Sequence, residues 1–158
     1  MKPEFMVILL GKCNEARLHE NKLECVDSEE ALDFFDAVYR AKKGSLKIKD
    51  NEGKELSWFE VIFNRAKEEP NTWILFSVYY DLRERGRNVR EGPFPNTLEL
   101  ISNEKPYAFV FVVEETVKFE IVNLVQWLDL SRRFGREVIV AIVDKHGDVS
   151  YYSMERFS

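Results

Sequence analysis

Two segments in the second half of the chain carry the residue types that could do chemistry. Residues 80–92 hold arginines interleaved with Glu84 and Glu91, and guanidinium groups are well suited to binding phosphate. These arginines are Arg83, Arg85, Arg87 and Arg90. Residues 138–152 read VIVAIVDKHGDVSYY, an apolar strand, a charged turn and a strand with two adjacent tyrosines. No Gly-rich phosphate loop, metal-ligand cluster or Ser-His-Asp arrangement is recognisable in the sequence.

Together the two segments resemble the C-terminal half of the archaeal tRNA-intron (tRNA-splicing) endonuclease family. Residues 80–86 read YDLRERG and residues 89–92 read VREG. In the family, a Y-x-D-L-R-x-R-G-Y-x-V-x-x-G segment precedes a catalytic Tyr and His. A V-R-K-x-L-x-L-A-I-V-D-x-x-G-D-x-x-Y-Y segment then carries a catalytic Lys. The resemblance covers residues 71–158 well and residues 1–70 only in outline.

The resemblance implies metal-independent RNA cleavage with no cofactor, giving a 2′,3′-cyclic phosphate and a 5′-hydroxyl. The family assigns base, acid and phosphate-binding cation to Tyr, His and Lys, whose positions match Ile101, Lys105 and Arg136 in this sequence. Isoleucine has no proton to exchange, lysine is a poor acid at neutral pH, and arginine does not act as an acid or base. Losing one general acid or base costs about 10²- to 10⁴-fold in rate. We therefore expect a non-catalytic, structural subunit.

The basic residues near these positions have two interpretations. Arg87, Arg90, Lys105 and Arg136 could contact RNA, or they could be ordinary solvated charges. The chain has a net charge of −5, whereas proteins that grip nucleic acid by themselves usually present a basic face.

The loop of residues 144–148 is the feature with the clearest implied role. In the family, an equivalent Asp-rich loop enters a basic cleft of the opposite subunit and positions its active site. The loop consists of Asp144, Lys145, His146, Gly147 and Asp148. The alternative is a plain hairpin turn in which Gly147 supplies a positive φ and Asp148 caps locally.

The last strand is predicted over residues 149–154, and by resemblance it meets the last strand of another subunit. Its interface residues would be Val149, Tyr151, Tyr152 and Met154, followed by Phe157. Aromatic side chains are frequent anchors of such interfaces. The two tyrosines could equally be the core and surface residues of an edge strand in a monomer.

The implied assembly is a heterotetramer of two copies of this chain and two of a catalytic paralogue, acting on precursor tRNA. Two alternatives remain open. One is an active but rearranged nuclease, a homo-oligomer in which Tyr107 and Lys105 do the chemistry. The other is a fold relative that serves only as an interaction protein.

The element pattern predicts a mixed α+β protein of the α/β type, with a small N-terminal domain over 1–70 and a nuclease-like domain over 71–158. In the second half it predicts helices at 72–85 and 123–134. It predicts strands at 88–91, 97–101, 107–113, 138–143 and 149–154.

In the first half we expect strands at 5–10 and 17–26 that could pair with each other. Two capping boxes, Asp27 with Glu30 and Ser57 with Glu60, are expected to open helices. Further elements are a stop at Gly44, a short strand over 45–49, a turn at 51–53 and a boundary at 68–71.

Composition supports a folded protein: 45% of the 158 residues are hydrophobic and 13% are aromatic. No apolar run is long enough to span a membrane, and the N-terminus lacks the features of a signal peptide. We therefore expect a cytoplasmic location. Cys13 and Cys25 lack a zinc-type spacing, and free thiols are the expectation, with a disulfide as the alternative for a hyperthermophile protein.

Overall fold

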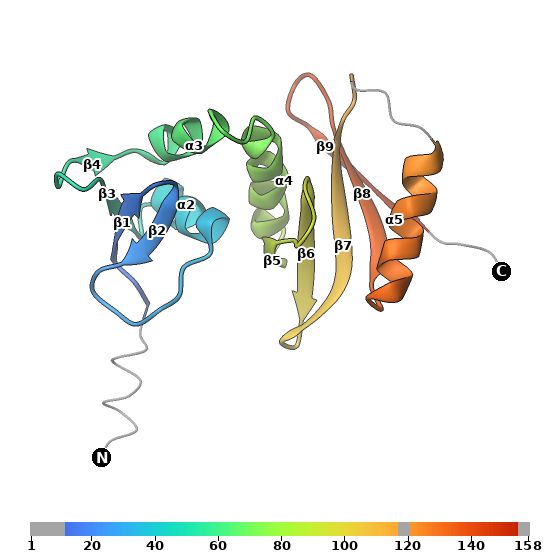
Figure 1. The fold of residues 1–158 in the computed structure, drawn as a ribbon, viewed down its shortest axis with the longest axis horizontal. Helices are drawn as coiled ribbons and strands as arrows, with labels where there is room; N and C mark the ends of the chain where they lie inside the picture. Colours follow the sequence, from blue (N-terminus) through green and yellow to red (C-terminus); the bar gives the residue numbers. More distant parts are fainter. Residues whose placement is uncertain (1–11, 117–120, 155–158) are drawn as a thin grey trace, which may run out of the picture. The chain divides into compact units, whose positions relative to one another are not determined.

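The computed structural model describes residues 12–116 and 121–154 (Figure 1). The chain forms two compact units, residues 1–72 and 73–158, called here the first and second unit. Each contains a β-sheet and helices, which confirms the predicted mixed α+β class. Among the described residues, none of the helices combines the length and apolar character needed to cross a membrane.

The first unit contains a four-stranded sheet with the order β2-β1-β3-β4. Its strands are β1 (Glu15–His19), β2 (Lys22–Cys25), β3 (Lys47–Lys49) and β4 (Glu55–Leu56). Along β1, buried Ala16 and Leu18 alternate with more exposed residues, so one face of the sheet is buried. Helices α2 (Phe34–Lys43) and α3 (Trp58–Ala66) pack against each other and contribute further buried residues to this unit.

The prediction of one strand over residues 17–26 is wrong. The chain turns at Glu20 and Asn21, both with positive φ (49° and 61°), so that β1 and β2 form a tight hairpin. The sequence has no glycine at this turn, and the pattern across it looks continuous. The predicted strand over 5–10, and its pairing, lie outside the described residues.

The capping box expected at Asp27 and Glu30 is also wrong. Helix α2 begins at Phe34, and its cap is Asp33, whose carboxylate accepts a hydrogen bond from the Asp36 amide at 3.1 Å. The other helix signals are confirmed. Gly44 ends α2 with φ 87°, and Ser57 and Glu60 form both hydrogen bonds of a capping box at the start of α3.

The second unit contains a five-stranded sheet with the order β5-β6-β7-β8-β9. Its elements are α4 (Thr72–Glu84), β5 (Asn88–Glu91), β6 (Thr97–Ser102), β7 (Lys105–Glu114), α5 (Ile121–Arg133), β8 (Glu137–Val143) and β9 (Val149–Met154). All bounds lie within two residues of the predicted ones. Strands β7 and β8 run parallel because α5 connects them, whereas the other neighbours are antiparallel.

Strand β7 is buried on both faces, and Figure 1 shows α4 and α5 on opposite sides of the sheet. Phe109, Phe111 and Val113 face α5, where the Phe111 and Trp127 rings stack with centroids 4.7 Å apart. Gly92 of the recognised motif has a packing reason, since a Cβ there would lie 2.9 Å from the Thr97 carbonyl oxygen. The glycine of the V-R-E-G segment is therefore explained by its close approach to Thr97 at the start of β6.

Candidate functional site

The three positions matched to catalytic residues come together at one end of the five-stranded sheet. Lys105 begins β7, and Ile101 of β6 pairs with Pro106 of β7. Arg136 directly precedes β8, whose first residue pairs in parallel register with Ala108 of β7. The structure thus brings Ile101, Lys105 and Arg136 to the same edge, as a shared site requires.

The connection between β6 and β7 is a turn of two residues. Ser102 pairs with Lys105, which leaves a turn of Asn103 and Glu104, both with positive φ (52° and 66°). This is the geometry of a two-residue hairpin turn. The turn carries neither a Tyr nor a His, its ionisable side chain is that of exposed Glu104, and Lys105 is also exposed.

Arg136 binds the buried carboxylate of Glu99, a residue of strand β6. Its Nε donates to Glu99 Oε2 at 2.8 Å, and its Nη1 donates to the Phe134 carbonyl oxygen at 2.6 Å. From β5, Arg90 Nε donates to the other Glu99 oxygen at 3.0 Å. The Glu99 side chain is only 5% exposed, and a buried carboxylate requires this kind of compensation. The Glu99 charge is therefore compensated within the protein, and the two guanidinium groups together leave one positive charge in excess.

Sequence reasoning missed Glu99, although a signal exists. Glu99 and Arg90 are direct cross-strand partners in the β5–β6 hairpin, a pairing that opposite charges favour. The four residues considered for RNA contact divide accordingly. Arg90 and Arg136 bind Glu99, whereas Arg87 and Lys105 are exposed.

Next to Arg136 lies a cavity of about 450 Å³ between the end of α5 and strands β8 and β9. Leu128, Arg132, Val138 and Met154 are among its lining residues. The cavity thus combines apolar walls with two basic residues, Arg132 and Arg136, and one acidic residue, Glu137.

The loop of residues 144–148 is ordered by its own aspartate. Asp144 Oδ1 accepts hydrogen bonds from the amides of His146 (2.8 Å) and Asp148 (2.9 Å), and Gly147 has φ 85°. Both the turn interpretation and the docking interpretation fit these contacts. One oxygen of Asp144 shapes the loop, while the side chains of Lys145, His146 and Asp148 are exposed.

Strand β9 is an edge strand, and its two tyrosines point to opposite faces. Tyr151 donates its hydroxyl hydrogen to Asp81 of α4 at 2.6 Å, and Arg85 lies over its ring at 5.4 Å. Burial, reinforced by the hydrogen bond to Asp81, raises the pKa of Tyr151 above its usual range. Tyr152 is 53% exposed. Among the predicted interface residues, Phe157 lies outside the described residues.

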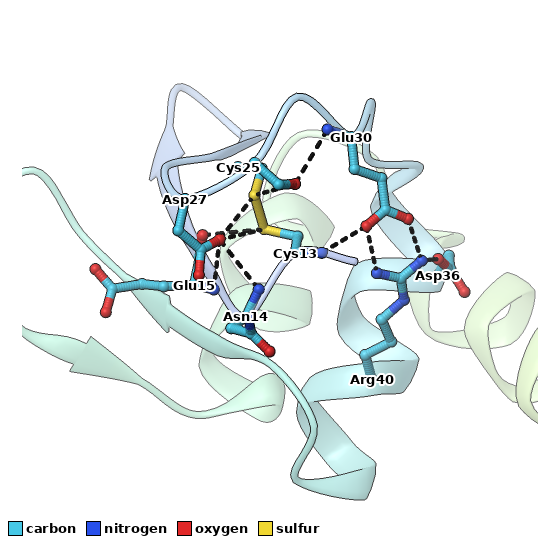
Figure 2. Close-up of a disulfide and its surroundings, with 9 residues drawn as sticks. Cys13, Asn14, Glu15, Cys25, Asp27, Glu30, Asp36 and Arg40 are labelled. Atoms are coloured by element: carbon cyan, nitrogen blue, oxygen red, sulfur yellow. Dashed lines mark hydrogen bonds and ion pairs between the residues drawn. A yellow bond between two sulfur atoms is a disulfide. The ribbon is translucent and has the colours of Figure 1, made fainter. Parts of the chain in front are cut away.

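A second group of chemically interesting side chains lies in the first unit, around Cys13 and Cys25 (Figure 2). These cysteines form a disulfide, so the expectation of free thiols is wrong. The hairpin of β1 and β2, which sequence reasoning did not recognise, brings them together. Glu30 accepts from the Cys13 amide at 2.7 Å and binds Arg40, whose hydrogen bond lowers the pKa of Glu30.

Comparisons with known proteins agree with the geometry of the second unit. Residues 72–151 match the family described as tRNA intron endonuclease, catalytic C-terminal domain. A tRNA-splicing endonuclease of Methanococcus maripaludis is 31% identical over 155 residues, covering 92% of this chain and 83% of the relative. One from Thermococcus onnurineus is 28% identical over 136 residues, covering 84% of this chain and 79% of the relative.

Proposed function

The chain belongs to the tRNA intron endonuclease family, and we propose that within it the protein is a structural subunit that does not cleave RNA itself. It assembles with a catalytic paralogue in the cytoplasm, as a heterotetramer of two copies each. That complex excises introns from precursor tRNA. No cofactor or metal takes part in this cleavage.

The observation that carries the proposal is the ion pair between Arg136 and Glu99. A phosphate-binding cation must offer its charge and its donors to the substrate. Arg136 Nε instead binds a buried carboxylate that Arg90 also binds. The two-residue turn between β6 and β7 supports the same proposal, because it carries neither a Tyr nor a His.

What survives in this chain is the part that a partner would use. The loop of residues 144–148 projects from the β8–β9 hairpin with exposed charged side chains, and Asp144 keeps it in shape. We place Asp148, with support from Asp144, in a basic cleft of the catalytic subunit. The exposed edge of β9, with Tyr152 on one face, is then available to a strand of another subunit.

The central experiment compares this protein, a catalytic paralogue and their mixture on an intron-bearing precursor tRNA. We expect no cleavage by this protein alone and cleavage by the mixture. Cleavage by the pure protein that is lost in Lys105→Ala and Tyr107→Phe variants would replace the proposal with that of a rearranged nuclease. Failure to bind any endonuclease subunit would favour an interaction protein outside tRNA splicing.

The loop is tested by Asp148→Asn and Asp144→Asn, measured by co-elution with the catalytic partner. Asparagine keeps an oxygen that can accept the two amide hydrogen bonds at position 144, so the substitution removes charge and retains the turn. Glu104→Gln, an exposed turn residue between β6 and β7, is the matched control. Both loop variants should weaken assembly. Equal co-elution of the two loop variants and the control would show that the loop is only a hairpin turn and does not dock into the partner.

A further inference from the structure

The disulfide in the first unit lies among hydrogen-bond acceptors, surroundings that suit cysteine thiols (Figure 2). Asp27 Oδ1 lies 3.1 Å from Cys25 Sγ and 3.5 Å from Cys13 Sγ. The Glu15 carbonyl oxygen lies 3.0 Å from Cys13 Sγ. A disulfide sulfur has no hydrogen to donate, so in the oxidised protein these electron-rich atoms face one another at contact distance. A thiol hydrogen or a cation would turn the same contacts into favourable ones.

We propose that the reduced protein binds a thiophilic divalent cation, of the Zn²⁺ type, through Cys13, Cys25 and Asp27. One donor atom from each residue lies within 4.8 Å of the other two. Thiolate sulfur and carboxylate oxygen are both zinc ligands, at about 2.3 Å and about 2.0–2.2 Å, so three of them converge over a span of this size. A water molecule would complete a tetrahedral site.

The carboxylate is already held in place for this role. Asp27 Oδ1 accepts from the amides of Asn14 at 3.1 Å and Glu15 at 3.4 Å, which fixes its orientation toward the sulfurs. Glu30 is not available as a fourth ligand, because Arg40 and the Cys13 amide occupy its oxygens. Cys13 is 2% exposed, whereas Asp27 is exposed, so the cation would enter from the Asp27 side.

The exchange between the two forms balances. A dithiol reductant gives two electrons and two protons to the Cys13–Cys25 bond and becomes a disulfide itself. The two thiols then release their protons to solvent as their sulfurs bind the cation. The disulfide and the bound metal ion would thus be alternative cross-links of the same β1–β2 hairpin. The sequence separation of 12 and the carboxylate ligand explain why no zinc motif was recognised.

The test uses the full chain, reduced with dithiothreitol, freed of reductant without oxygen, and titrated with Co²⁺ and then Zn²⁺. We expect one Co²⁺ per chain, a near-ultraviolet thiolate-to-cobalt band and visible bands of a tetrahedral site, all removed by Zn²⁺. The oxidised protein should show none of these bands. Absence of the bands from the reduced protein overturns the proposal.

Variants assign the ligands. Cys25→Ser should abolish the thiolate band. Asp27→Asn, which keeps an acceptor for the two amides, should weaken binding at least as much as loss of an outer-shell partner, about 10- to 100-fold. Glu24→Gln removes the same charge from an exposed position of β2 and should change nothing. Equal affinities for Asp27→Asn and Glu24→Gln would show that Asp27 is not a ligand and sink the three-residue site. Circular dichroism of each reduced variant separates loss of binding from loss of folding.

Discussion

The two units of this protein stabilise their sheets in different ways. In the second unit, β7 has ten residues, is buried on both faces, and stacks Phe111 on Trp127 of α5. In the first unit the strands have two to five residues. There a disulfide joins the segment before β1 to the end of β2, and an ion pair joins Glu30 to Arg40.

This difference matters for the proposed function, because the candidate site and the proposed partner-facing elements all belong to the second unit. A large apolar core can hold this end of the sheet in place whichever polar side chains it presents. Ile101, Lys105 and Arg136, the three positions matched to catalytic residues, lie together at this end of the sheet. On the proposed function, this chain keeps the scaffold through its packing, while another subunit supplies the chemistry.

The largest expected effect comes from truncating the core of the second unit. Phe111→Ala removes a side chain that is 3% exposed and stacked on Trp127, and we expect a loss of about 3–5 kcal/mol in the free energy of unfolding. Hydrogen exchange, followed by peptide, should show faster exchange across β6 to β9. If exchange in the first unit rose equally, the two units would not be separate in stability.

The disulfide gives the corresponding prediction for the first unit. Cys25→Ser opens a loop with a sequence separation of 12, and removal of such a link costs about 3 kcal/mol. Measured with a chelator present, so that no metal can substitute, exchange should accelerate in β1 and β2. The exposed Ser102→Ala serves as the control in the second unit. Unchanged exchange in β1 and β2 would mean that the core of the first unit suffices without the link.

The same contrast explains which features could be predicted from the sequence. Continuous apolar segments such as 138–143 and 107–113 identify strands by themselves, so the second unit was predicted closely. The turn at Glu20–Asn21 was missed because its residues carry no strong turn signal. The roles of Asp27 and Glu30 were missed because their partners, Cys13 and Arg40, become neighbours only after folding.

The ion pairs of Glu99 with Arg90 and Arg136 allow the contribution of charge to the stability of the second unit to be measured apart from that of apolar packing. Glu99→Gln leaves the guanidinium groups of Arg90 and Arg136 without their carboxylate. Arg90 is 49% exposed and Arg136 is 21% exposed, so water screens part of the cost. We expect a loss of about 2 kcal/mol, less than for an isolated buried pair. The measurement is urea denaturation, with the exposed Glu137→Gln as control.

This variant also bears on the proposed function. Arg136 would be freed to bind phosphate, so a gain in affinity for precursor tRNA in Glu99→Gln would show that the ion pair suppresses an RNA contact. Unchanged affinity would assign the cluster to stability alone. On the proposed function, cleavage should appear in neither case, because the substitution introduces neither a Tyr nor a His.

The smallest expected effect concerns the contact between β9 and α4. Tyr151→Phe removes the hydrogen bond to Asp81, and we expect a loss of about 1 kcal/mol near neutral pH. Urea denaturation measures it, and the exposed Tyr152→Phe is the matched control on the same strand. An equal loss of unfolding free energy in both variants would argue that the hydrogen bond between Tyr151 and Asp81 does not contribute to stability.

The pH dependence of this difference is a sharper test than its size. The folded state raises the pKa of Tyr151, mainly by burial, whereas an unfolded tyrosine titrates near pH ~10. The phenol's contribution is therefore fully present below pH ~10 and is lost as the pH rises further, because only the unfolded chain ionises there. The advantage of the native protein over Tyr151→Phe should shrink above pH ~10. If it stayed constant or grew, the hydroxyl would be ionising in the folded protein, and the contact with Asp81 would not be holding it neutral.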